Sequence, residues 1–191
     1  MTDQAEWIGS AGEHTVASDL RSLDALYRRY RAPIQHFLYE LCGSVDIAEE
    51  LTQITFMKAC TGLLGFRGEC SISSWLFRIA RNAYLDSLRR PDPRRIETDE
   101  LLALPDGTTF ADPARAYAAA EQRSQIMLAL AQLPERQRTM LLLRDAEGLA
   151  YAEIADVLGI SLAAVKVNLF RARTAFRAAY TAFERPEGEY E

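Results

Sequence analysis

Residues 151–177 carry the pattern of two short helices joined by a tight turn, and they read YAEIADVLGISLAAVKVNLFRARTAFR. Ala155 lets two helices cross closely, Gly159 supplies a positive φ for the turn, and Val165 fills the angle between the helices. Ser161 precedes the second helix as its N-cap. This spacing is typical of a helix-turn-helix, whose second helix enters the major groove of duplex DNA.

The same offsets also occur in helical hairpins that bind nothing, and the local charge separates the two interpretations. Residues 161–185 hold five basic residues and one acid, a net charge of +4, in a chain whose total charge is −5. A basic patch on an acidic chain favours DNA binding. The side chains left available to bases or phosphates are those of Ser161, Ala163, Ala164, Lys166, Val167, Asn168, Arg171, Arg173 and Arg177.

The composition, with 49% hydrophobic and 26% charged residues among 191, is typical of a soluble and mostly helical protein. No apolar stretch approaches the roughly 18 to 20 residues that span a bilayer. The N-terminus, MTDQAEWIGSAGEH, has neither the basic start nor the apolar run of a signal peptide. We therefore expect no membrane insertion and a cytoplasmic location.

Side chains with metal-binding or catalytic chemistry are few and scattered. Cys42, Cys60 and Cys70 form an odd set without CxxC spacing, so we expect reduced packing residues, with a redox-sensing pair as the alternative. His14 and His36 are isolated, and the sequence has no glycine-rich phosphate loop or nucleophile elbow. The sequence thus predicts no catalytic residues, no metal site, no cofactor and no enzymatic activity.

Charge and helix-breaking residues divide the chain into two helical parts. Residues 91–120 hold three basic and six acidic residues, and prolines and Gly107 interrupt any helical period in PDPRRIETDELLALPDGTTFADP. This composition predicts a flexible acidic linker between two small domains of an all-α fold. The expected parts are an acidic disordered tail over 1–18, a helical domain over 19–90, the linker over 91–112, the helix-turn-helix domain over 113–183 and an acidic tail over 184–191.

Two helices are predicted in the first part of the first domain. One opens at Ser18 or Asp19, and Pro33 bends or interrupts it. The other begins at Asp46 with Glu49 as its capping-box partner. Its apolar stripe leaves other faces to Glu49, Glu50, Gln53 and Phe56. An exposed phenylalanine beside acids suggests a protein contact, whereas a core phenylalanine with a solvated acidic face is an equally good interpretation.

A glycine-rich loop, GFRGECSIS, precedes a third predicted helix, SSWLFRIARNAYLDSLRR. The helix combines a buried stripe of Trp75, Leu76, Ile79, Ala83 and Leu88 with polar positions at Arg78, Arg81, Asn82, Arg89 and Arg90. Since arginines hold phosphates and a loop can pocket an unstacked base, this unit is suited to clamp a nucleic-acid strand. An ordinary amphipathic helix with Trp75 in the core is the alternative.

Three segments in this order resemble a known family. DIAEELTQITFMKA, SSWLFRIARNAYLDSLRR and LPERQRTMLLLRDAEGLAYAEIADVLGISLAAVKVNLFRAR are similar to the two domains of bacterial RNA polymerase sigma factors of the extracytoplasmic-function (ECF) type. The resemblance covers residues 20–90 and 121–180. It implies a region 2 helical bundle and a region 4 helix-turn-helix. The implied partners are core RNA polymerase, promoter DNA and an anti-sigma factor, which many relatives have.

The resemblance also implies roles for particular residues. In such factors the DIAEELTQITF helix grips the coiled coil of the polymerase β′ subunit, and the second domain lies near the flap of the β subunit. The implied polymerase contacts are Asp46, Glu49, Glu50, Gln53 and Phe56. The implied contacts with a melted minus-ten element, whose flipped base is held at the loop, are Arg67, Arg78, Arg81, Asn82, Asp86 and Arg89. The helix that begins at Ser161 would read the minus-thirty-five element.

The second helix of the helix-turn-helix departs from the family. Where the family has Gly-Thr-Val-Lys-Ser-Arg, this chain has Ala-Ala-Val-Lys-Val-Asn over residues 163–168. The loss of hydroxyl groups and an arginine predicts fewer phosphate contacts and a changed promoter preference. Asn168 is expected to pair with adenine and Lys166 with guanine.

A free-standing helix-turn-helix regulator that binds duplex DNA as a dimer is the alternative function. The DIAEELTQITF helix distinguishes the two functions, because a simple repressor does not need it. An enzyme or a protein-interaction scaffold is the third interpretation.

Overall fold

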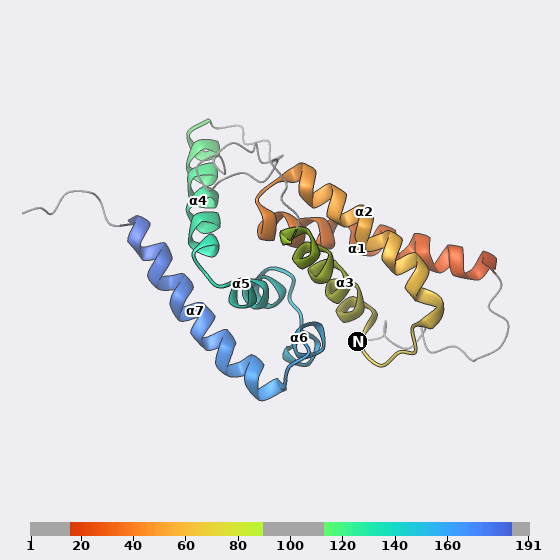
Figure 1. Cartoon of the computed structure of the whole chain (residues 1–191). Helices are drawn as coiled ribbons and strands as arrows, with labels where there is room; N and C mark the ends of the chain where they lie inside the picture. The colour runs from red at the N-terminus through yellow and green to blue at the C-terminus, as the bar shows by residue number, and fades with distance from the viewer. Residues whose placement is uncertain (1–15, 90–112, 185–191) are drawn as a thin grey trace, which may run out of the picture.

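In the computed structural model the described residues are 16–89 and 113–184. Within these ranges the chain forms seven α-helices and two short helical turns, and no strand (Figure 1). The predicted all-α class is confirmed. The predicted linker over 91–112 and most of the two predicted tails lie outside the described residues. The last three residues of the expected N-terminal tail, 16–18, are helical.

The first domain contains α1 (Val16–Cys42), α2 (Val45–Gly62), the 3-10 turn η1 (Leu63–Gly65) and α3 (Ile72–Leu88). Apolar residues at helical spacing turn one face of each helix inward. Phe37 of α1 and Phe77 of α3 meet edge to face, with ring centroids 5.3 Å apart. The other large core side chains of this domain are Leu26, Ile34, Leu38, Leu41, Ile47, Leu51, Phe56, Leu76 and Tyr84.

Pro33 lies inside α1, and the helix continues beyond it to Cys42. Of the two predicted effects of Pro33, an interruption is therefore wrong, and a bend stays a prediction. Proline removes one backbone hydrogen bond from a helix. The next turn buries Ile34, Phe37 and Leu38 completely, and tertiary packing of this kind outweighs the lost bond.

The start of α2 differs from the predicted capping box. Ser44 is the N-cap, and its Oγ accepts a hydrogen bond of 3.4 Å from the Ile47 backbone N–H. Asp46 lies in the first turn, where a carboxylate complements the helix dipole. Gly43, with φ of +71°, reverses the chain between α1 and α2, so the cap falls on the residue directly after it.

The second domain contains α4 (Pro113–Ala131), α5 (Glu135–Leu141), the π-helical turn η3 (Leu142–Ala146), α6 (Tyr151–Leu158) and α7 (Leu162–Glu184). The predicted helix-turn-helix is α6 and α7. Gly159 between them has φ of +64°, and Val165 is completely buried in the angle between the helices. Ser161 Oγ accepts a hydrogen bond of 3.2 Å from the Ala164 N–H, which confirms the predicted cap.

The two domains lie against each other. Helix α3 of the first domain packs next to α6 of the second (Figure 1). The turn η3 also contacts α1. A single hydrophobic cluster contains buried residues of both domains. The predicted nucleic-acid clamp and the predicted helix-turn-helix are therefore neighbours in this conformation.

Candidate promoter and polymerase interfaces

Helix α2 presents an acidic face to solvent. Asp46, Glu49, Glu50 and Gln53 follow one another at helical spacing, and all four side chains are exposed. Phe56 does not share this exposure, since it is only 7% exposed and meets Tyr27 edge to face with ring centroids 4.9 Å apart. The expectation of an exposed Phe56 is wrong. The phenylalanine belongs to the core that holds the acidic face in place.

The loop before α3 is anchored at both ends. Phe66 rests against Trp75 with ring centroids 5.1 Å apart, and Gly68 has φ of +72°. Ser71 is the N-cap of α3, where its Oγ accepts a hydrogen bond of 3.1 Å from the Ser74 N–H. Arg67 is exposed on the loop. Of the predicted buried stripe, Leu76 and Ala83 are buried, Trp75 and Ile79 are partly buried, and Leu88 is 42% exposed.

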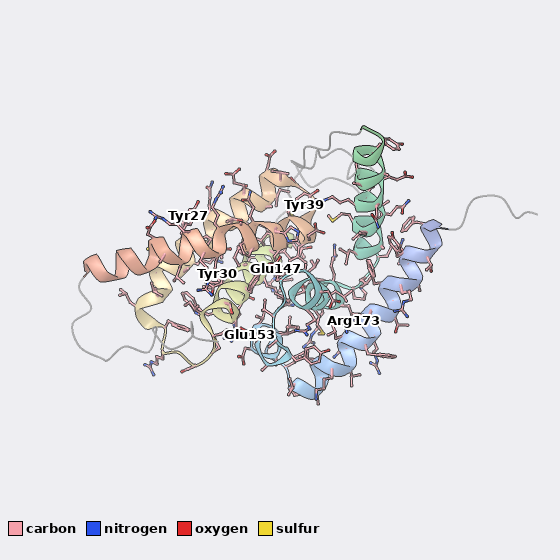
Figure 2. The ribbon with its side chains drawn as sticks, turned by 180° about the vertical axis from the view of Figure 1, so that it is seen from behind. Tyr27, Tyr30, Tyr39, Glu147, Glu153 and Arg173 are labelled. Atoms are coloured by element: carbon pink, nitrogen blue, oxygen red, sulfur yellow. The ribbon has the colours of Figure 1, made fainter. Side chains whose placement is uncertain are left out.

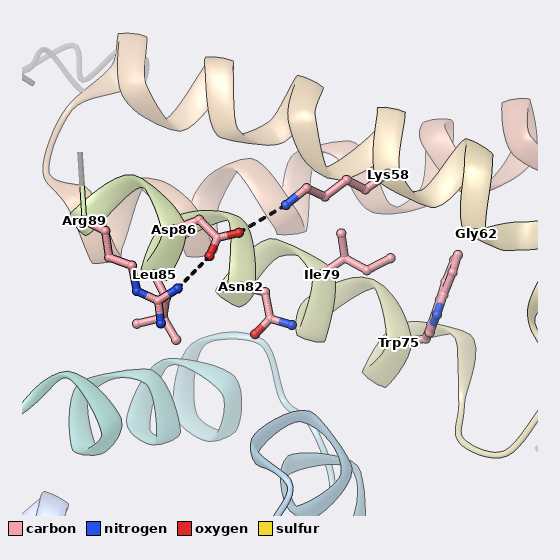
Figure 3. A pocket seen from close by; sticks show the side chains of 8 residues that line it. All are labelled: Lys58, Gly62, Trp75, Ile79, Asn82, Leu85, Asp86 and Arg89. Atoms are coloured by element: carbon pink, nitrogen blue, oxygen red, sulfur yellow. Dashed lines mark hydrogen bonds and ion pairs between the residues drawn. The ribbon is translucent and has the colours of Figure 1, made fainter.

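A groove of about 540 Å³ runs between α2 and α3 (Figure 3). Trp75 forms one end of it, packed against Gly62, where an added Cβ would lie 3.0 Å from the tryptophan ring. At the other end Asp86 lies between two cations, and it accepts hydrogen bonds of 3.3 Å from both Lys58 and Arg89. The remaining lining residues are Ile79, Asn82 and Leu85. A flat apolar wall beside cationic groups suits an unstacked base and its phosphates.

Helix α7 turns Val165, Leu169 and Ala172 inward and leaves its opposite side to solvent. Among the predicted DNA contacts Ser161, Lys166, Arg171, Arg173 and Arg177 are exposed, and Ala164 is partly buried. Asn168 is also partly buried, and its Nδ2 donates a hydrogen bond of 2.8 Å to the Ala164 backbone oxygen. Val167 and Phe170 are 52% and 73% exposed.

Arg173 has an intramolecular partner. Its Nε donates a hydrogen bond of 3.1 Å to Asp145 Oδ2, and its Nη2 donates to Oδ1 of the same carboxylate. Figure 2 labels Arg173 on α7. The hydrogen bonds to Asp145 raise the pKa of the guanidinium. Arg173 is therefore ion-paired with Asp145 of η3 in this conformation, although its side chain is exposed like those of Arg171 and Arg177.

The geometry agrees with the comparison to known families. Residues 26–94 match the family described as sigma-70 region 2, and residues 123–176 match the family described as sigma-70, region 4. RNA polymerase sigma factor YlaC of Bacillus subtilis is 34% identical over 155 residues, which are 80% of this chain and 88% of that protein. The chain is an ECF-type RNA polymerase sigma factor.

A second relative and a solved structure are also similar to the sigma factor. The ECF sigma factor SigM of Bacillus subtilis is 29% identical over 160 residues, 83% of this chain and 95% of that protein. The sigma factor RpoE of Bartonella quintana, solved with the anti-sigma factor NepR, has the same fold. Its TM-score is 0.65 at 23% identity, over 84% of this chain and 98% of that one.

As an ECF sigma factor the chain directs promoter recognition by RNA polymerase and is not an enzyme. The alternative of a free-standing dimeric regulator is set aside, because region 2 accompanies the helix-turn-helix. No helix in the described parts of the chain is long and apolar enough to cross a membrane. Within the same parts no group of three or more His, Cys, Asp or Glu side chains is arranged to hold a metal ion.

The three cysteines of the sigma factor are free thiols in separate places. Cys42 Sγ donates a hydrogen bond of 3.3 Å to the Ser44 backbone oxygen, and Arg78 Nη2 lies 3.7 Å from Cys70 Sγ. Burial raises the pKa of the Cys70 thiol, which disfavours the reactive thiolate. This environment agrees with the predicted packing role for Cys70.

Region 2 and region 4 are joined by polar pairs, which we call the interdomain contact. Arg81 Nε and Nη2 each donate a hydrogen bond of 3.1 Å to Glu135. Ser71 Oγ and Ser73 Oγ each donate a hydrogen bond of 2.8 Å to Glu153 Oε1. These pairs use Arg81, which the sequence assigned to promoter DNA.

Glu153 is suited to its place in the interdomain contact. Burial alone would raise its pKa, but hydrogen bonds from the Ala150 N–H, Ser71 and Ser73 outweigh burial and lower the pKa. The carboxylate is thus held in its charged form between the N-termini of α3 and α6. Local sequence patterns could not reveal this pairing, because the serines and Glu153 are about 80 residues apart in the chain.

A second polar cluster joins the domains beside α1. His36 Nδ1 lies 2.8 Å from Glu147 Oε1, and His36 Nε2 lies 3.6 Å from Glu40 Oε1. Arg123 of α4 also approaches Glu40, with 3.5 Å between Nη2 and Oε1. The hydrogen bond to Glu147 raises the pKa of His36, and both carboxylates add to the effect. His36, which looked isolated in the sequence, is therefore a charged bridge between the regions when it is protonated.

Proposed function

We propose that α2 docks this sigma factor on the coiled coil of the polymerase β′ subunit through Asp46, Glu49, Glu50 and Gln53. The observation that carries the proposal is that these four side chains share one exposed face. Three carboxylates near a DNA-binding surface would repel DNA, so this face is better suited to a basic surface of a protein partner. Phe56 supports this face from within through its contact with Tyr27. Region 4 lies near the flap of the β subunit in the same assembly, in the cytoplasm.

The groove between α2 and α3 receives an unstacked base of the minus-ten element. The Trp75 ring offers a stacking wall, and Asn82 offers an amide to a base edge. Arg67 on the loop and Arg89 at the end of α3 are exposed on either side and contact phosphates. Asp86 orients the cations of the groove through its bonds to Lys58 and Arg89.

Arg78 and Arg81 join the minus-ten surface when the two regions separate. Both are partly buried where α3 faces α6, and a cavity of about 590 Å³ lined by them and Asn82 lies between α3 and the turn of the helix-turn-helix. DNA that contacts Arg78 and Arg81 must reach the side of α3 that faces α6 here. We therefore propose that the packed arrangement is the form of the free sigma factor and that the polymerase-bound form is open.

An anti-sigma factor is the further partner that we propose. The Bartonella RpoE structure, whose fold this chain shares, is a complex with one. Region 2 and region 4 are already in contact here, so a small protein can bridge both without first bringing them together. Co-purification from cells tests this partner directly. A small protein bound together with the sigma factor, and absent when polymerase subunits are bound, is the expected result.

Titration of core RNA polymerase with the full-length chain tests the docking proposal. We expect Asp46→Ala combined with Glu49→Ala to weaken binding by about tenfold or more, since opposed charges across an interface contribute on the order of 1 kcal/mol or more each. Asp24→Ala is the matched control, because Asp24 is an exposed acid of α1 paired only with Arg28 among the described ion pairs. Equal affinities of wild type, the double variant and Asp24→Ala for core polymerase would overturn the assignment of α2 to the polymerase interface.

A further inference from the structure

The outward surface of α7 combines apolar and cationic side chains in a regular row. Ala163, Val167 and Phe170 are spaced by four and three residues and therefore lie along one line of the helix. All three are exposed. Lys166 and Arg171 flank the line, and both are exposed. The surface that faces DNA is thus apolar along its centre and positively charged at its edges.

The fold does not require this apolar row. Val165, Leu169 and Ala172 provide the inward side of α7, and each is at most 1% exposed. Val167 and Phe170 lie on the opposite side, at 52% and 73% exposed. Single exposed apolar residues are ordinary on protein surfaces. Here two exposed apolar residues lie on one line of the recognition helix, between two cations. This arrangement indicates a ligand that has an apolar group flanked by negative charges.

Asn168 has an acceptor within its own helix in this structure. Its Nδ2 donates one N–H to the Ala164 backbone oxygen at 2.8 Å, and the side chain is partly buried. The side chains of Lys166, Val167 and Phe170, by contrast, are exposed. The exposed chemistry of these three is apolar contact from Val167 and Phe170 and hydrogen-bond donation from Lys166.

We infer that Val167, supported by Phe170, reads thymine methyl groups in the minus-thirty-five element. The inference rests on the proposed role of α7 at that element. The thymine C5-methyl is the one apolar group that a base presents in the major groove, so an apolar side chain held there recognises thymine. The replacement of the family's serine by Val167 then becomes a change of specificity. The hydroxyl of the family's serine gives way to the apolar side chain of Val167.

Charge complementarity identifies DNA as the occupant of this surface. Residues 162–183 contain four basic residues and no acid. A protein partner that covered Val167 and Phe170 would have to match these cations with its own acids, whereas the phosphates of a duplex lie on both sides of the major groove. Binding of a protein to this row is the competing outcome, and the experiment below separates the two.

The experiment removes single methyl groups from the DNA. Holoenzyme made from core polymerase and the full-length chain first selects a promoter from a randomised library. Each thymine of the selected minus-thirty-five element, on either strand, is then replaced by deoxyuridine, and holoenzyme affinity is measured. At one or two positions we expect affinity to fall about fourfold, the contribution of one buried methyl group. Val167→Ser should abolish the effect at one of these positions, and Val167→Ile should keep it.

Thr174→Ala is the matched control, because Thr174 is exposed on the same helix one turn beyond Phe170. It should leave the fourfold effect unchanged. If the holoenzyme binds and initiates but no deoxyuridine substitution matters, or the effect survives in Val167→Ser, the inference is overturned while the proposed function stands. The same holds if the selected element contains no thymine on either strand. Failure of the holoenzyme to select any promoter would instead count against the proposed function.

Discussion

Arg81 of α3 and Glu135 at the start of α5 form a two-point ion pair that ties region 2 to region 4. Thr139 Oγ1 donates a further hydrogen bond of 2.8 Å to the same carboxylate. The side chains of the pair are only 15% and 24% exposed. Under the proposed assignment of α3 to the minus-ten element, this pair must break before DNA can contact Arg81.

Glu135→Ala should loosen the interdomain contact, because the substitution leaves a largely buried guanidinium without its partner. We expect amide hydrogen exchange in α3 and α6 to accelerate by about tenfold, as for a contact worth on the order of 1 to 2 kcal/mol. The control is Asp24→Ala, which breaks the well-exposed pair between Asp24 and Arg28 within α1 and should leave exchange in α3 unchanged. Unaltered exchange in Glu135→Ala would mean that Arg81 is not held by Glu135.

Stability should depend on pH through His36. Its pKa is raised in the folded protein, chiefly by the hydrogen bond to Glu147, with Glu40 adding to the effect and Arg123 opposing it. A group with a raised pKa stabilises the fold fully below its unfolded pKa and loses this contribution as the pH rises through the folded pKa. In urea unfolding, wild type should have a higher free energy of unfolding than His36→Gln at low pH. We expect this difference to shrink as the pH rises from about 6 through neutrality. A difference that stays constant over this range would contradict the bridge.

Arg171 and Arg173 should differ in their effect on DNA binding, although they lie two residues apart. Arg171 is exposed and available to a phosphate, so Arg171→Ala should lower the salt dependence of holoenzyme binding by about 0.9 in log–log slope. Arg173 is held by Asp145, so we expect Arg173→Ala to change the slope less. Both losses should be independent of promoter sequence. Equal slopes for wild type and Arg171→Ala would remove Arg171 from the phosphate contacts.

Gly62 should control the position of the Trp75 ring. A Cβ at residue 62 would lie 3.0 Å from Trp75 Cζ2, so Gly62→Val must push the ring into the groove. In a Trp7→Phe background Trp75 is the remaining tryptophan, and its emission should shift while promoter melting declines. Gly65→Val is the control, since nothing lies within 4 Å of its added Cβ. Identical emission in both variants would show that Gly62 does not limit the ring.

The helix-turn-helix could be predicted from the sequence because its determinants are local. The positive φ of Gly159, the cap by Ser161 and the burial of Val165 depend on residues within a few positions of one another. The predicted cap of α2 at Asp46 is wrong, because two good capping residues stand close together there. Ser44 and Asp46 can both cap a helix, and the turn at Gly43 decides between them.

The parts that sequence could not predict depend on packing between distant segments. The burial of Phe56 requires Tyr27 of α1 beside it, and helical spacing alone does not place that partner. The pairing of Glu153 with Ser71 and Ser73 depends on how two domains meet across a linker. The hydrogen bond from Asn168 Nδ2 to the Ala164 backbone oxygen depends on the side-chain rotamer, which the sequence does not give.

Run-off transcription tests the central claim most directly. Core RNA polymerase, with and without the full-length chain, is given a linear template carrying a promoter that the holoenzyme selects from a randomised library. We expect a transcript of defined length only when the chain is present, and a strong loss of it with Asp46→Ala combined with Glu49→Ala. A chain that binds this DNA yet gives no transcript above that of core polymerase alone would contradict its role in promoter recognition.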